Sequence, residues 1–126
     1  MRLMIVISLM FLIIFAAAIG NLYLIESLTT NLTNSLEQLE TKVINEEWTE
    51  AELIYENLEK EWKKAKNIVA ISVDHADLRH LEISINRMSS LIDTKNKTDL
   101  LPEITVTKNL VKNIPEEERL YIKNIF

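Results

Sequence analysis

The first 25 residues contain an apolar stretch that a small water-soluble domain cannot bury cheaply. Apart from Ser8, every residue from Leu3 to Ile19 is apolar. A glycine and an asparagine then interrupt the run, which resumes up to Ile25, and no charged residue lies inside it. As one helix rising 1.5 Å per residue, this stretch reaches across a hydrocarbon core of about 30 Å. We therefore expect the lipid bilayer to be the partner of residues 3–25.

A stretch of this kind is either a cleaved signal peptide or a retained signal anchor. A signal peptide would use Arg2 as its basic region and Ala16 and Ala18 as the small residues before a cleavage site. An anchor would keep the whole stretch. We favour the anchor because the apolar run continues beyond the alanines to Ile25, which is longer than an ordinary signal-peptide core.

Charges at the two ends of the apolar stretch predict its orientation. Arg2 and the amino terminus are positive, whereas Glu26 is the first charge on the other side. The positive-inside rule then places the N-terminus in the cytoplasm. We expect a single-pass protein of the cell membrane, with residues 1–25 as an N-terminal membrane anchor and residues 26–126 as an extracytoplasmic domain.

Composition argues against several classes of function. Residues 26–126 carry all 19 acids and 13 of the 14 bases, so their formal charge is 13 − 19 = −6. Nucleic acid is therefore not an expected partner, since phosphate binding is driven by clustered Lys and Arg. Without cysteine the chain has no disulfide, thiolate metal site or Cys nucleophile. Gly20 is the only glycine and lies in the apolar stretch, so no glycine-rich phosphate loop is present. We expect no enzyme activity, no catalytic residues and no cofactor.

The remaining apolar residues recur at spacings of three and four, which is typical of helices with one buried face. These apolar stripes are Ile25, Leu28, Leu32, Leu36, Leu39 and Val43; Trp48, Ala51, Tyr55, Leu58, Trp62, Ala65 and Val69; Leu78, Leu81, Ile85, Met88 and Ile92; and Leu100, Ile104, Val111 and Ile114. They predict an all-α chain: an N-terminal transmembrane helix followed by a small antiparallel helical bundle.

Capping residues and prolines set the expected helix boundaries. Residues with favourable capping side chains precede two helices: Asn45 the second, and Ser72 or Asp74 the third. The fourth helix is expected to start at Thr98 or Asp99. Pro102 is expected in the first turn of the fourth helix, where a missing N–H costs little. Pro115 is expected to break or kink the chain before a short last helix.

Aromatic residues recur every seven positions in the second stripe, at Trp48, Tyr55 and Trp62. They predict either core packing or an aromatic strip that binds a ligand. We favour core packing, because residues at heptad spacing normally face another helix.

The segment "DHADLRHLE" holds the candidates for metal or acid–base chemistry, which are Asp74, His75, Asp77, His80 and Glu82. On a helix the two histidines lie about 140° apart, so they cannot face one metal ion together unless His75 lies in the loop before the helix. The three-residue spacing of Asp77 and His80 occurs once, whereas a di-metal bundle repeats such pairs on further helices. We therefore predict no metal or catalytic site. His75 is expected to pack and form a hydrogen bond, and His80 to be solvated.

The segments "VDHADLRHLEISINRMSSLID" and "EEERLYIKNIF" resemble the bacterial domain-of-unknown-function family 4363. The features that carry the resemblance are Trp62, Asp74-His75, Glu82-Ile83-Ser84-Ile85, Arg87 and Lys123-Asn124-Ile125. The resemblance implies a membrane-anchored, extracytoplasmic helical protein of Firmicutes with no assigned activity. It also implies a membrane-protein partner of the YetF-like kind. Ala76-Asp77 departs from the more glutamate-rich pattern of the family, which argues further against ligands there.

Two functions stay open on the sequence. The first is a non-enzymatic interaction or structural module at the cell envelope, which predicts a dry, continuous core. The second is an extracytoplasmic sensor or binding domain for a small ligand or cation, which predicts a pocket lined by stripe residues with converging polar groups.

Overall fold

The computed structural model describes residues 1–70 and 75–125, the side chains of residues 115–125 excepted. Within these ranges the chain forms four helices and no strand: α1 (Arg2–Ile44), α2 (Trp48–Val69), α3 (His75–Asp93) and α4 (Lys97–Ile125). This confirms the all-α fold, with a long apolar N-terminal helix followed by a helical bundle.

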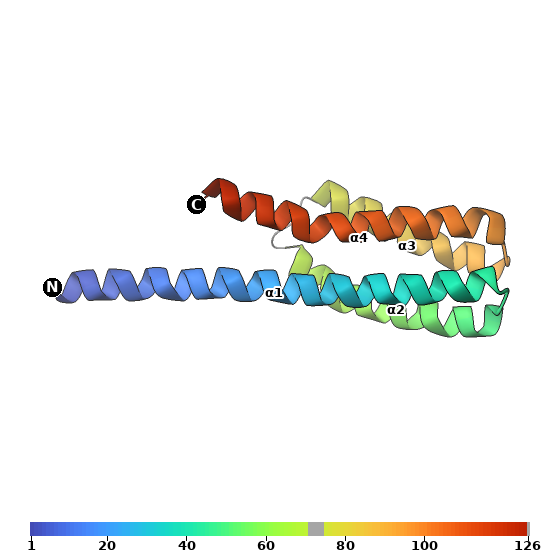
Figure 1. Ribbon diagram of the computed structural model, residues 1–126, viewed down its shortest axis with the longest axis horizontal. Helices are drawn as coiled ribbons and strands as arrows, with labels where there is room; N and C mark the ends of the chain where they lie inside the picture. The colour runs from blue at the N-terminus through green and yellow to red at the C-terminus, as the bar shows by residue number, and fades with distance from the viewer. Residues whose placement is uncertain (71–74, 126) are drawn as a thin grey trace.

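The helices run up and down along one axis (Figure 1). The α1–α2 and α3–α4 turns lie together at one end of the bundle, and both chain termini lie towards the other end. Helix α1 packs mainly against α2 and α4, α3 packs mainly against α4, and the contact between α2 and α3 is the smallest. The result is an antiparallel four-helix bundle from which one half of α1 projects.

Helix α1 has 43 residues and two different halves. Residues 1–17 are all exposed, although nearly all of them are apolar. From Ile25 onwards a buried stripe runs to Val43. Among the described residues α1 is the one helix long and apolar enough to cross a membrane. The division of the chain at residue 25 stays a prediction.

The four stripes meet in one core, as the sequence predicted. Every stripe residue from Ala51 to Ile114 is buried, and so is every α1 stripe residue except Leu28, which is partly buried. Of the three aromatic residues, Trp62 and Tyr55 are 3% and 6% exposed, whereas Trp48 at the start of α2 is only partly buried. Core packing of Trp62 is therefore confirmed.

The α1–α2 turn corrects the expected role of Asn45, which caps the end of α1 and does not cap the start of α2. Glu46 has a φ of 58°. Its N–H donates to the carbonyl of Val43, and the N–H of Glu47 donates to the carbonyl of Lys42. This pair of bonds is a Schellman motif, which satisfies the last carbonyls of a helix and reverses the chain within three residues.

The α3–α4 turn repeats this geometry. Lys95 has a φ of 52°, its N–H donates to Ile92, and the N–H of Asn96 donates to Leu91. The Asn96 side chain then caps α4, because its Oδ1 accepts the N–H of Asp99 at 3.2 Å. The expected start at Thr98 or Asp99 was therefore late by one or two residues. The expected caps of α3, Ser72 and Asp74, lie outside the described residues.

Two lysines make contacts at this end of the bundle, one between α1 and the start of α2 and one between the two turns. Lys42 of α1 lies 3.0 Å from Glu47 and 2.7 Å from Glu50. Hydrogen bonds to Glu50 and then Glu47 raise the pKa of Lys42, and the bond from Lys42 lowers the pKa of Glu50. Lys97 of α4 donates to the carbonyl of Ile44 at the end of α1, at 2.9 Å.

The expectation was wrong for Pro102 and wrong in part for Pro115. Pro102 is the sixth residue of α4 and therefore lies in its second turn, not its first. Pro115 does not break the chain, because α4 continues through it to Ile125. A proline inside a helix removes one backbone hydrogen bond, and the helix can continue with a bend. The C-terminal part of α4 leans away from α1 in Figure 1.

Replacing Trp62 tests the core. Trp62→Ala should lower the free energy of unfolding by about 3–5 kcal/mol, because it empties a large buried site. Leu53→Ala on the same helix is the matched control, since Leu53 is 59% exposed. Denaturant unfolding measures both changes. A loss below about 1 kcal/mol for Trp62→Ala, the scale of surface changes, would contradict the core assignment.

Replacing Lys95 tests the turn geometry. Lys95→Gly should raise the free energy of unfolding by about 0.5–1 kcal/mol, because glycine adopts the left-handed conformation without the strain that a Cβ causes. Lys95→Ala removes the same charge and keeps the strain, so it should give no such gain. Equal stability of the two variants would show that the turn is not left-handed in solution.

Candidate functional site

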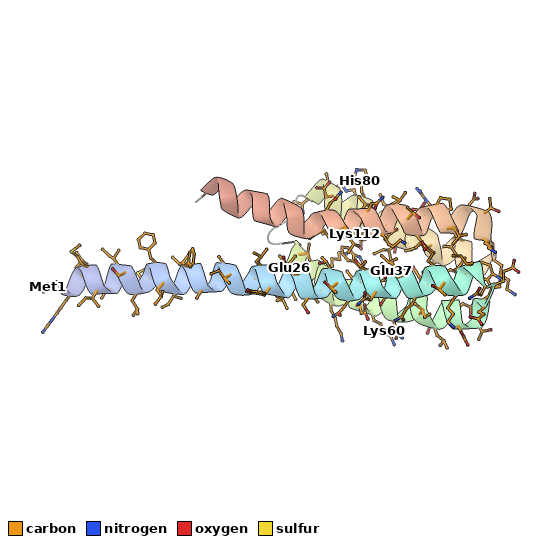
Figure 2. The ribbon with its side chains drawn as sticks, in the orientation of Figure 1. Met1, Glu26, Glu37, Lys60, His80 and Lys112 are labelled. Carbon is orange, nitrogen blue, oxygen red and sulfur yellow. The ribbon has the colours of Figure 1, made fainter. Side chains whose placement is uncertain are left out.

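The histidines of "DHADLRHLE" do not meet in the structure. His75 is the first residue of α3 and is exposed, so the expectation that it packs against apolar neighbours was wrong. His80 is exposed as expected, and Figure 2 shows it on the side of the bundle opposite Lys60. The physical reason for the error is position: His75 is in line with Leu78, but it stands at the end of the helix, beyond the last buried residue of the stripe.

The acids of this segment are likewise dispersed. Glu82 pairs with Lys66 of α2, with Oε1 and Nζ 2.6 Å apart, and thereby links α2 to α3. Asp77 lies in the first turn of α3, where a carboxylate suits the positive end of the helix dipole. Asp74 lies outside the described residues. Among the described residues no group of three or more His, Cys, Asp or Glu side chains lies close enough to hold a metal ion.

The structure reveals a polar cluster between α3 and α4 that the sequence analysis missed. Ser84 and Thr107 are 4% and 0% exposed, and their hydroxyl oxygens lie 2.6 Å apart. Ser84 also donates to Oε1 of Glu103 at 2.7 Å, and Thr107 donates to the carbonyl of Glu103 at 2.8 Å. At the surface Arg87 Nη1 lies 3.4 Å from the other carboxylate oxygen of Glu103.

The contacts in this cluster outnumber the hydroxyl hydrogens that can form hydrogen bonds. Three contacts link the Ser84 hydroxyl, the Thr107 hydroxyl and the oxygens of Glu103, but each hydroxyl carries one hydrogen. With an ionised carboxylate, only two of the three can hold a hydrogen at one time. The cluster fixes the register of α3 against α4, because only this alignment supplies every buried hydroxyl with an acceptor. The sequence does contain a signal for this cluster. Ile104 and Val111 of the fourth stripe are seven residues apart, and Thr107 occupies the stripe position between them.

A second buried hydrogen bond joins α2 to α3. The Tyr55 hydroxyl donates to the carbonyl of Ile85 at 2.8 Å. Burial raises the pKa of Tyr55 to about 12, with smaller contributions from the charges of Glu59 and Asp93. Tyr55 is therefore a neutral donor that fastens α2 to α3, where the packing is thinnest. A buried, neutral tyrosine that already has an acceptor is a structural group.

Two open grooves flank α2. The groove against α1 has a volume of about 450 Å³ and is lined mainly by amides and charged side chains, namely Asn31, Asn34, Ser35, Gln38, Ile54, Asn57, Lys60, Glu61 and Lys64. The groove against α3 has a volume of about 290 Å³ and is acidic, lined by Glu52, Tyr55, Glu56, Glu59, Ser89, Ile92 and Asp93. Both are shallow, and most of their lining residues lie outside the predicted stripes.

The chain matches a family described as a domain of unknown function, DUF4363, over residues 19–125. The chain belongs to this family. No match was found among curated proteins, and none among solved structures. The match begins inside the apolar stretch, and it covers residues 19–44 of α1 and all of α2, α3 and α4.

Zinc tests the histidine segment. Because both histidines are exposed, His75→Ala and His80→Ala should each change the free energy of unfolding by less than about 0.5 kcal/mol. Added zinc should leave the thermal midpoint of the parent chain unchanged. Strong stabilisation by zinc that either substitution abolishes would mean that the segment is a metal site.

High pH tests the environment of Tyr55. The folded state keeps the phenol neutral up to a pKa of about 12, whereas an unfolded tyrosine ionises near 10. The resulting stabilisation is complete below about pH 10 and is lost as the pH rises to 12, by about 2 kcal/mol. Tyr55→Phe should cost about 1 kcal/mol at pH 7, through the lost hydrogen bond.

The difference between parent and variant should then shrink or reverse sign between pH 10 and 12. Urea unfolding of both proteins across this range measures it. A constant difference would contradict a raised pKa at Tyr55.

Proposed function

We propose that this protein is a single-pass membrane protein whose bundle acts outside the cytoplasm as a non-enzymatic interaction or structural module at the cell envelope. The observation that carries the proposal is the exposed half of α1. Twelve large apolar side chains there are at least 45% exposed: Leu3, Met4, Ile5, Val6, Ile7, Leu9, Met10, Phe11, Leu12, Ile13, Ile14 and Phe15.

The magnitude of this exposure supports a lipid environment. Burying one such side chain contributes about 1.5–3 kcal/mol relative to leaving it in water. Twelve of them therefore represent roughly 20 kcal/mol or more, which exceeds the ~5–15 kcal/mol that stabilises a typical folded domain. A bilayer supplies the apolar environment, and α1 is long enough to cross it.

The character of the bundle supports an interaction module over an enzyme. Two of its buried polar side chains, Tyr55 and Ser84, are engaged in bonds between helices, whereas the buried Trp62 Nε1 has no hydrogen-bond partner among the described residues. Its grooves are open and lined mainly by surface residues. The sensor alternative predicts a pocket lined by stripe residues, and of these only Tyr55 and Ile92 line the groove against α3, while none lines the groove against α1. A membrane protein of the YetF-like kind is the partner that we propose first.

The orientation follows from the charges around the apolar stretch. Arg2 lies before it and Glu26 after it, and the bundle is acidic. The positive-inside rule then supports a cytoplasmic N-terminus and an extracytoplasmic bundle.

A chain without cysteine is suited to single-cysteine topology mapping. Ser90 is exposed in α3, so Ser90→Cys should react with a membrane-impermeant maleimide on intact cells. The matched control is Ser8→Cys, in the middle of the apolar half, which should stay unlabelled before and after lysis. Labelling of Ser90→Cys only after lysis would contradict the proposed orientation.

The same samples test whether the stretch is retained. The mass of the protein extracted from membranes should correspond to a chain that still contains residues 3–18. A mature chain that begins at Ile19 would show that the stretch is a signal peptide, and the anchor would then be wrong.

A further inference from the structure

Helix α2 is divided into an acidic half and a basic half. Residues 48–59 contain four glutamates and no base, which gives a formal charge of −4. Residues 60–69 contain four lysines and one glutamate, which gives +3. Because the domain as a whole is acidic, the second half of α2 is a local reversal of sign. The four lysines are Lys60, Lys63, Lys64 and Lys66, and we refer to them as the lysine cluster.

The antiparallel packing of α1 and α2 places this cluster at the end of the bundle next to the apolar half of α1. The Ser35 hydroxyl donates to Glu61 at 3.2 Å, so these two positions lie at about the same height. Lys64 is then level with residue 32, seven residues beyond Ile25, which is about 10 Å along the axis at 1.5 Å per residue. Figure 2 agrees, since it shows Lys60 close to the level of Glu37.

No spacer separates the bundle from the apolar half of α1. Ile25, the last residue of the apolar stretch, is completely buried in the core of the bundle. The C-terminal end of α4 extends past the level of Glu26, beside the apolar half of α1 (Figure 2). Helix α2 ends about level with residue 26, because Glu61 is level with Ser35. A bilayer around the apolar half would therefore meet α4 first on one side, and on the side of α2 it would meet the bundle near Ile25, with the lysine cluster held at a fixed height.

The charges of the cluster are only partly neutralised within the protein. Lys66 pairs with Glu82 at 2.6 Å, and Lys63 pairs with Glu59 at 3.2 Å, but the Lys63 side chain is 72% exposed. Lys64 and Lys60 line the groove against α1 and form no ion pair among the described side chains. The cluster thus keeps a net positive charge towards solvent.

Helix capping alone does not explain this pattern. Cations stabilise the C-terminal end of a helix through its dipole, but the effect is confined to the last turn. Lys66 lies in the last turn of α2. Lys63 and Lys64 lie outside the last turn, so helix capping does not account for them.

We propose that Lys63, Lys64 and Lys66 contact the anionic phosphate headgroups of the bilayer that surrounds α1. The headgroup layer extends about 5–8 Å beyond the hydrocarbon core on each side. The backbone of such a lysine lies about 10 Å along the axis from Ile25. Its flexible side chain covers the remaining distance to the headgroup layer and brings the ammonium group to the phosphates. This inference rests on the proposed membrane anchoring and adds a second, electrostatic contact that fixes the tilt of the bundle on the membrane surface.

The test uses the full chain in lipid nanodiscs of phosphatidylcholine alone, or of phosphatidylcholine mixed equally with anionic phosphatidylglycerol. A neutral amine-acylating reagent is added, and mass spectrometry gives the rate at each lysine. Acylation of Lys63 and Lys64 should be about three- to sevenfold slower in the anionic discs, because a surface potential of about −30 to −50 mV enriches protons there by this factor. Salt at ~0.5 M should largely remove the difference.

Lys95 is the internal control. It is exposed in the turn at the far end of the bundle, about 30 Å from the level of Ile25, which is several screening lengths. Its rate should be the same in both discs. Equal rates at Lys63 and Lys64 in the two discs would overturn the proposal, and so would an equal fall at Lys95.

Two further arms separate the possible outcomes. Soluble glycerol phosphate added to the phosphatidylcholine discs should leave the rates unchanged; slowing there would mean a site for free phosphate and not a lipid contact. If the chain does not co-elute with either disc, the anchor itself is wrong and both proposals are overturned.

A variant pair gives an independent measure. The difference in thermal midpoint between the two disc types should shrink in Lys63→Gln/Lys64→Gln and persist in Lys95→Gln. A difference that persists in both variants would also contradict the lysine contact.

Discussion

The structure depends on one continuous helix that is exposed to two different environments. Helix α1 presents apolar side chains all around its first half and a single buried stripe in its second half. Because both halves belong to one helix, the environment of the first half fixes the position of the bundle. Ile25 lies at the junction and is buried by the bundle itself. Rotation or tilt of α1 would therefore move all four helices together.

The helix–helix contacts that hold the bundle differ along its axis. At the far end, two Schellman turns close the α1–α2 and α3–α4 hairpins, and the Lys97 side chain connects the two hairpins by donating to the backbone carbonyl of Ile44. In the middle, buried hydroxyls at Tyr55, Ser84 and Thr107 select one alignment of the apolar stripes. Apolar burial supplies most of the stabilisation but tolerates sliding, whereas a buried hydroxyl without an acceptor costs about 1–3 kcal/mol. These polar contacts give the bundle its register.

The sequence predicted the core residues correctly, because their positions depend on the periodicity of the stripes. It predicted the helix ends less well, because a single residue there can adopt several conformations. The stripes placed Trp62, Leu81 and Ile104 in the core, because spacings of three and four determine a helix face whatever the neighbours are. Asn45 was assigned to the wrong helix end, since asparagine suits both kinds of cap and the left-handed residue of the turn is a glutamate. Pro115 does not end α4, because a helix can continue with a bend after one missing backbone hydrogen bond.

The account depends most on α1 being a single helix that runs without a break from the bilayer into the bundle. Amide hydrogen exchange of the full chain in nanodiscs, read by mass spectrometry, tests this directly. This arrangement predicts slow exchange from about residue 6 to residue 44, with no fast segment at Gly20 or Asn21, and fast exchange at Thr49 in the first turn of α2, where N–H groups have no acceptor within the helix. Exchange at Gly20 and Asn21 as fast as at Thr49 would contradict it, because the apolar half would then be joined to the bundle by a flexible link.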